Sequence, residues 1–191
     1  MRHGQTAWNV ERRRQGHDGP GLNAQGREDA RRAADELARL HAERPIAALY
    51  SSDLDRALET AAIIGQRLGL PVRADERLRE RHQGAWQGLL AEEIAGQHGE
   101  VMDFIGADPL GGGPPGGETG RQVVDRMADA LSDIARRHPG ERVVVVSHGG
   151  AISLVRWLAL ADLAPEFLDG PVWHTWPRNG EVIRLEWAPR D

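Results

Sequence analysis

Apolar residues recur with a helical period in two long segments of the chain. From Asn23 to about Ala42, the apolar positions 30, 33, 37 and 40 fall on one face of a helix, and charged residues fill the other face. Asn23 is a residue type that caps the first turn of a helix. From Thr119 to His138, the apolar positions 123, 127, 131 and 134 form a second stripe. The spacing predicts two long helices, each with one face in the core.

Short apolar runs of strand length lie between the helical segments. Residues 46–50 form one run, and residues 142–146 form a second that is dominated by valine. Such continuous runs are typical of strands buried on both faces of a parallel sheet. Residues 71–74 indicate a further strand. Strands that alternate with amphipathic helices are typical of an α/β fold.

The remaining pattern predicts shorter elements and loops. Residues 89–105 are expected to be helical, and the glycine- and proline-rich stretch 111–117 is expected to be a loop. Another helix is expected after Ser51–Asp53, a triplet of capping residues, and it ends at Gly69. The residues expected on its buried face are Leu58, Ala61, Ala62 and Leu68.

The C-terminal region is expected to form two strands on either side of a turn at Asn179–Gly180. The second strand covers residues 181–187, where apolar residues alternate, and it is placed at the edge of the sheet. His174 lies in the first strand. A packed or surface histidine is the simpler interpretation of that residue.

Composition excludes several classes of function. The 191 residues suffice for one domain, residues 1–191, and the net charge of −5 disfavours a nucleic-acid partner. The chain has no cysteine, which excludes disulfides, thiolate metal sites and cysteine-based phosphatase chemistry. All 24 basic residues are arginine, so a single arginine is a weak clue. With no signal peptide and no long apolar span, a cytoplasmic protein without a membrane partner is expected.

The opening residues Arg2-His3-Gly4-Gln5-Thr6 suit a phosphate site. A neutral imidazole is a nucleophile at neutral pH, and an arginine fork matches phosphate oxygens in geometry and charge. The glycine allows the backbone to approach an anion closely, and the threonine adds a hydroxyl. In isolation the motif is better explained as a charged chain terminus, so the other motifs of the chain decide its meaning.

Two further candidates follow predicted strands. Arg56 lies in the first turn of the helix after strand 46–50, and His148 follows strand 142–146, with Gly149 opening the next helix. Ligands of α/β proteins bind at the carboxyl ends of parallel strands, where helix N-termini favour anions. Both residues are therefore candidates for a phosphate pocket, although a lone arginine is usually a surface residue and a lone histidine usually structural.

Four motifs, taken in their order along the chain, resemble the histidine phosphatase superfamily, also called the phosphoglycerate mutase-like family. They are Arg2–Gly4, Ser51–Ala57, Glu80–His82 and Ser147–Gly150. The resemblance extends to about Trp187 and implies a three-layer α/β/α sandwich with a mostly parallel central sheet. A strand precedes the first motif in the family, whereas only Met1 precedes it here. The first strand is therefore expected to be truncated, either lost or left out by a late start.

The resemblance also implies roles for individual residues. His3 would accept the phosphoryl group, Glu80 would protonate the leaving oxygen, and residues 78–118 would form a cap over the site. The residues implied around the phosphate are Arg2, Asn9, Arg56 and His148. The residues implied in a loop over the substrate are Gln15 and Gly16. Those implied as supports of the site are Gly4, Thr6, Glu118 and Gly149. Without the family resemblance, Asn9 would be interpreted as a helix or turn cap. Glu80 would be interpreted as a salt-bridged surface residue.

The resulting hypothesis is hydrolysis of a small phosphomonoester, a sugar phosphate or phosphoglycerate-type compound, through a phosphohistidine. No metal or other cofactor is expected, because arginines and histidine supply the positive charge. A phosphoglycerate mutase-type phosphotransferase is the first alternative. It is disfavoured because Gln83 and Ala91 stand where mutases carry a tyrosine and a lysine. A non-catalytic phosphate-binding protein is the second alternative.

Overall fold

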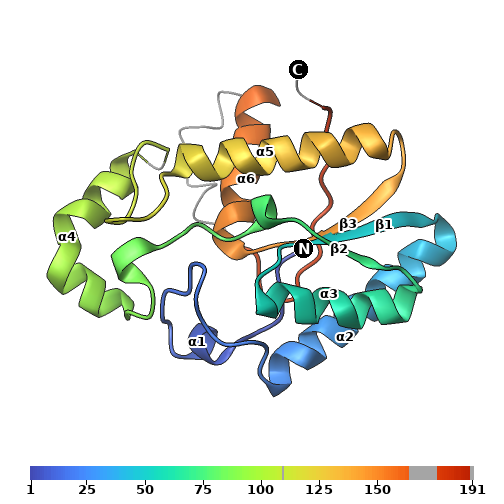
Figure 1. Ribbon diagram of the computed structural model, residues 1–191, viewed down its shortest axis with the longest axis horizontal. Helices are drawn as coiled ribbons and strands as arrows, with labels where there is room; N and C mark the ends of the chain where they lie inside the picture. Colours follow the sequence, from blue (N-terminus) through green and yellow to red (C-terminus); the bar gives the residue numbers. More distant parts are fainter. Residues whose placement is uncertain (109, 164–175, 190–191) are drawn as a thin grey trace.

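Three parallel strands form the centre of the molecule in the order β2–β1–β3 (Figure 1). The computed structural model describes residues 1–108, 110–163 and 176–189. The strands are β1 (Ile46–Ser51), β2 (Val72–Ala74) and β3 (Arg142–Val146), which confirms the three strands predicted from the apolar runs. The helices are α1 (Ala7–Val10), α2 (Ala24–Glu43), α3 (Asp55–Leu68), α4 (Ala91–Ala107), α5 (Gly120–Arg137) and α6 (Gly149–Leu163), with short 3-10 helices η1 (Glu76–Leu78) and η2 (Gly84–Trp86).

Helices cover both faces of the sheet, as the continuous apolar strands require. On one face, α2 and α3 pack around Leu49, Ile64 and Val146. On the other face, α5 and α6 pack around Tyr50 and Val123. Successive residues of β1 thus enter opposite cores, because strand side chains alternate between faces. The expected three-layer α/β fold with a parallel sheet is confirmed (Figure 1).

The carboxyl ends of β1 and β3 lie at one edge of the sheet, because the two strands are parallel. Ser52 directly follows β1, and His148 lies two residues beyond β3. The start of the chain runs beside β3, where the N–H of His3 donates to the carbonyl oxygen of Ser147 at 3.0 Å and Arg2 forms a parallel bridge with Ser147. Three segments that are distant in sequence therefore meet at this edge.

Two of the predicted capping residues, Asn23 and Gly69, are confirmed. Asn23 caps α2 by accepting the N–H of Gly26 at 2.8 Å. Thr119 caps α5, and Gly69 ends α3 in the left-handed conformation that glycine adopts without strain. Among the described residues, no helix combines the length and apolar character needed to cross a membrane.

Two expectations for α3 are wrong. The N-cap of this helix is Leu54, without a side-chain hydrogen bond, so Ser51–Asp53 does not cap it. The hydroxyl of Ser52 lies 2.8 Å from Nε2 of His148 and accepts the N–H of Leu54 at 3.3 Å, one residue before α3 begins. Ala62 is exposed, because the buried stripe of α3 runs along the side that faces α2 and the sheet.

The strand expected over residues 181–187 is also wrong, since this segment has no regular secondary structure. The turn at Asn179–Gly180 is present. The alternating apolar residues serve as separate anchors instead: Val182 packs on the core beneath α2 and α3, and Trp187 packs on the core beneath α5. His174 and most of the other expected C-terminal strand lie outside the described residues.

Candidate active site

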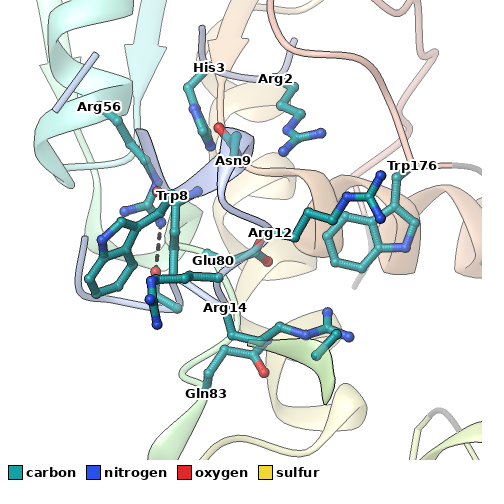
Figure 2. Close-up of a pocket in the computed structure, with 14 residues that line it drawn as sticks. Arg2, His3, Trp8, Asn9, Arg12, Arg14, Arg56, Glu80, Gln83 and Trp176 are labelled. Carbon is teal, nitrogen blue, oxygen red and sulfur yellow. Dashed lines mark hydrogen bonds between the residues drawn. The ribbon is translucent and has the colours of Figure 1, made fainter. Parts of the chain in front are cut away.

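An open pocket of about 280 Å³ contains the nucleophile candidate at this edge of the sheet (Figure 2). It is lined by His3 from the start of the chain, Arg56 from α3, Glu80 from the segment after η1, and Trp176 from the C-terminal region. The lining includes five arginines, at positions 2, 12, 13, 14 and 56, and one carboxylate. This excess of positive charge suits an anionic ligand.

His3 is buried, and its ring centroid lies 5.1 Å from that of His148. Its Nδ1 is 2.7 Å from the carbonyl oxygen of Gly4, which only accepts, so Nδ1 carries the proton. Burial, reinforced by the charges of Arg56 and Arg2, lowers the pKa of His3 well below its usual value of 6.5. The ring is therefore neutral at pH 7, and Nε2 has a free lone pair, as a nucleophile requires.

Three buried nitrogens around His3 have no hydrogen-bond partner within the part of the chain that the structure describes. They are Nε of Arg2, Nε of Arg56 and Nδ1 of His148. Leaving a buried polar group unpaired is unfavourable by about 1–3 kcal/mol. A bound phosphate offers the missing acceptors, and its dianionic charge complements the two guanidinium groups.

Arg56 also fixes the loop that borders the pocket. It donates to the carbonyl oxygens of Gly16 at 2.6 Å and Asp18 at 2.9 Å. Burial lowers the pKa of Arg56 to about 10, which leaves it charged at pH 7. The guanidinium therefore holds the loop with two nitrogens while its third, Nε, remains unpaired.

The first part of this loop is organised around Thr6. Thr6 caps α1, and Asn9 completes a capping box by accepting the N–H of Thr6 at 3.1 Å. The Thr6 hydroxyl also lies 3.1 Å from Oε1 of Gln15. Within the described part of the chain, Asn9 uses only its oxygen, so its amide nitrogen is left for the pocket that it lines.

Glu80 is buried at the N-terminus of α6. Its carboxylate accepts the N–H groups of Gly150 and Ala151, both at 2.9 Å, and that of Arg81 at 2.9 Å. The helix dipole favours an anionic or hydrogen-bond-accepting group at this position. A carboxyl group held here in the pocket has a fixed place from which to exchange a proton with a ligand.

Arg126 of α5 fixes the segment that carries Glu80. It binds the carboxylate of Glu118 through two hydrogen bonds of 2.8 Å and donates to carbonyl oxygens of the segment 77–80. Glu118 in turn accepts the N–H of His82 at 2.8 Å. Sequence reasoning missed Arg126, because nothing in the sequence distinguishes it from the other arginines.

Replacing Arg126 by alanine is expected to lower kcat about 10- to 100-fold and to destabilise the fold by about 2–3 kcal/mol. The reason is that Glu118 and the carbonyl oxygens around Glu80 lose their donors. The measurements are phosphatase kinetics and urea unfolding. Arg121→Ala, on the exposed face of the same helix, is the control and is expected to change neither. Equal behaviour of the two variants would contradict the positioning role.

The two buried histidines predict a loss of stability in mild acid. Burial, together with Arg56, lowers the pKa of both His3 and His148 well below 6.5. Below about pH 6.5 the unfolded chain therefore binds more protons than the folded chain, and the free energy of unfolding falls with pH. Each histidine contributes up to about 1.4 kcal/mol per pH unit.

Urea unfolding between about pH 6.5 and about pH 5 measures this slope. His3→Ala is expected to make it shallower by up to about 1.4 kcal/mol per pH unit. The amino group of Met1, whose pKa burial lowers to about 5, contributes equally to both proteins and cancels in the comparison. Parallel slopes would show that His3 is not held neutral by the fold.

The two supporting glycines leave space for protein atoms. A Cβ atom on Gly4 would collide with the backbone of Gly26, so this glycine lets the start of the chain contact α2 rather than the pocket. A Cβ atom on Gly149 would lie 2.7 Å from the Trp176 indole and 3.3 Å from Nε of Arg2. Gly149 therefore allows both side chains to approach α6.

Several pocket features have no signal in the sequence. Asn179 donates to the carbonyl oxygen of His3 and to Oδ1 of Asn9, both at 3.1 Å, and so ties the C-terminal turn to the opening motif. Trp8 and Trp176 line the pocket as well. Among the described residues, no group of three or more histidine, aspartate or glutamate side chains is arranged to hold a metal ion.

The chain belongs to the histidine phosphatase superfamily (branch 1), whose family profile matches residues 1–191. This result confirms the resemblance drawn from the four motifs.

Within that family, the chain is 44% identical over 154 residues to phosphoglycerate mutase-like protein 4 of Arabidopsis thaliana and 41% identical over 157 residues to a metal-independent phosphoserine phosphatase of the same plant. These matches cover 80% and 81% of the chain but 66% and 65% of the relatives, so the chain spans just under two thirds of their length. Among solved structures, it resembles a mycobacterial glucosyl-3-phosphoglycerate phosphatase in complex with VO3, with a TM-score of 0.80 and 33% identity over 94% of this chain and 85% of that one.

Proposed function

We propose that the protein is a metal-independent phosphomonoester hydrolase that acts through a phosphohistidine at His3. The observation that carries the proposal is the neutral His3 ring, with Nδ1 hydrogen-bonded to a carbonyl oxygen and Nε2 free, among nitrogens of Arg2, Arg56 and His148 that have no partner among the described residues. Membership of the histidine phosphatase superfamily and relatives named as phosphatases support it.

In the first step, Nε2 of His3 attacks phosphorus in line with the leaving oxygen. A bond between nitrogen and phosphorus forms as the ester bond between phosphorus and oxygen breaks. The Arg2 and Arg56 guanidiniums, with Nδ1 of His148 and the amide nitrogen of Asn9, stabilise the equatorial oxygens. Glu80 in its carboxylic acid form gives its proton to the departing alkoxide, which leaves as an alcohol.

In the second step, water attacks the phosphohistidine. Glu80, now a carboxylate, takes a proton from the water as the new bond between oxygen and phosphorus forms and the bond to His3 breaks. Inorganic phosphate leaves, and Glu80 is again protonated for the next cycle. The support of Glu80 by three backbone N–H groups keeps the carboxyl group in place through both steps.

The substrate class is a small phosphorylated metabolite that fits a pocket of about 280 Å³. The segment 78–118, which supplies Glu80, Gln83 and Ala91 to the lining, is the cap that would select it. Hydrolysis is preferred to mutase chemistry because Gln83 and Ala91 stand where mutases carry a tyrosine and a lysine.

Hydrolysis of p-nitrophenyl phosphate and of glycerol 3-phosphate in the presence of a chelator tests the proposal. Turnover of both is expected. Transfer of the phosphoryl group between positions of phosphoglycerate, without release of phosphate, would favour the mutase. Saturable phosphate binding without turnover would favour a non-catalytic phosphate-binding protein.

A further inference from the structure

Two arginines of the pocket have no hydrogen-bond or ion-pair partner among the described residues. The side chains of Arg12 and Arg14 line the pocket, yet neither makes a hydrogen bond or ion pair within the part of the chain that the structure describes. Arg13, between them, is engaged with Glu11 at 2.9 Å and with the carbonyl oxygen of Gly88 at 2.8 Å. Figure 2 shows Arg12 and Arg14 extending from the same loop, with Arg14 at the end of the pocket away from His3.

A phosphate at His3 does not require these two charges. Arg2 and Arg56, which have unpaired nitrogens beside His3, already balance a dianion. Arg14 is half-buried, and burial lowers its pKa despite the opposing charge of Glu80. A half-buried cation without a hydrogen-bond acceptor is unfavourable unless a ligand pairs with it.

The backbone conformation that places Arg12 at the pocket is unfavourable. Its φ of 61° lies in the left-handed region, where it is the only non-glycine among the described residues. Such a conformation is uncommon for a side chain larger than asparagine and is found mainly where the surrounding structure enforces it. All three consecutive arginines line the pocket, but Arg13 is paired with Glu11, whereas no acceptor within the described residues binds the exposed Arg12 or the half-buried Arg14.

We propose that Arg12 and Arg14 form a second anion subsite, which binds a carboxylate or a second phosphate carried by the substrate. This inference rests on the proposed phosphatase function, since it places the reacting phosphate at His3. The planar guanidinium groups pair with either anion through two parallel hydrogen bonds. The substrate is then a phosphomonoester with an additional negative group, bound across the pocket from His3.

Two matched pairs of esters test the subsite. Glycerol 3-phosphate differs from 3-phosphoglycerate only by a hydroxymethyl group in place of the carboxylate, and fructose 6-phosphate lacks the second phosphate of fructose 1,6-bisphosphate. We expect the protein to prefer the more anionic member of at least one pair in kcat/KM by about tenfold or more. Preference in the first pair assigns a carboxylate, and preference in the second assigns a phosphate.

Arg12→Gly and Arg14→Gln are each expected to reduce that preference at least about fivefold while hydrolysis of p-nitrophenyl phosphate is retained. Glycine is favourable at the left-handed position, so the first variant keeps the fold. Arg39→Gln, which removes the same charge from the exposed face of α2, is expected to leave the preference unchanged.

An absent preference, or one that survives in both variants while p-nitrophenyl phosphate is still hydrolysed, overturns the subsite and leaves the phosphatase proposal intact. Failure of the unmodified protein to hydrolyse any ester would instead contradict the phosphatase proposal. In that event, titration calorimetry with the same proteins and esters measures the preference as a ratio of Kd values, so the subsite is decided independently of turnover.

Discussion

Replacing His3 by alanine is expected to lower kcat for p-nitrophenyl phosphate by about 10⁴-fold or more, because the variant has no nucleophile to receive the phosphoryl group. The neighbouring His148 does not replace it, since its Nε2 is occupied by the hydroxyl of Ser52 at 2.8 Å. The measurement is steady-state hydrolysis with a chelator present, over a range of substrate that separates kcat from KM.

The control for this variant is His41→Ala. His41 lies at the far end of α2 and accepts the N–H of Ile46, the first residue of β1, at the opposite edge of the sheet from the pocket. It is expected to retain nearly full activity. Circular dichroism checks that both variants are folded, because His3 is buried and its removal leaves a cavity. A folded His3→Ala protein with activity within about tenfold of the original would exclude the mechanism.

Replacing Glu80 by glutamine is expected to reduce hydrolysis of glycerol 3-phosphate by about 10³-fold and that of p-nitrophenyl phosphate by less than about tenfold. The difference arises because an alkoxide is strongly basic and must be protonated as it leaves, whereas p-nitrophenolate leaves without a proton. Comparing kcat/KM for the two esters in the same variant measures proton donation directly.

Comparing the two esters also separates a loss of proton donation from structural damage in the Glu80→Gln variant. Glutamine replaces one oxygen of Glu80 by an NH2 group, which cannot accept the N–H of Gly150 or Ala151, so some local rearrangement is expected. Such damage would reduce the hydrolysis of both esters. Similar losses for the two would therefore assign Glu80 to positioning alone and remove it as the proton donor.

The core of the fold was predictable because its sequence pattern is local. The valine run of β3 and the stripes of α2 and α5 each specify an element, and parallel strands separated by helices specify a layered sheet. The exceptions arise where tertiary contacts decide. The apolar residues of 181–187 pack on two different cores instead of forming a strand.

The pocket was predictable only in part. His3, Arg56 and Glu80 belong to recognisable motifs, and the structure brings them to one pocket. Arg126 and Asn179 act through long-range hydrogen bonds, which a single sequence does not encode in any local pattern. In a chain whose basic residues are all arginine, an arginine that organises the pocket is indistinguishable from one on the surface.

The central claim is that the phosphoryl group passes through His3, and the most direct measurement is to find it there. The protein is mixed with p-nitrophenyl phosphate, quenched in alkali during the first turnovers to preserve phosphohistidine, and analysed by peptide mass spectrometry. We expect a phosphoryl group on the peptide that contains His3 and none on the corresponding peptide of His3→Ala. An unmodified His3 in protein that has turned over, or a phosphoryl group on another side chain, would contradict this account.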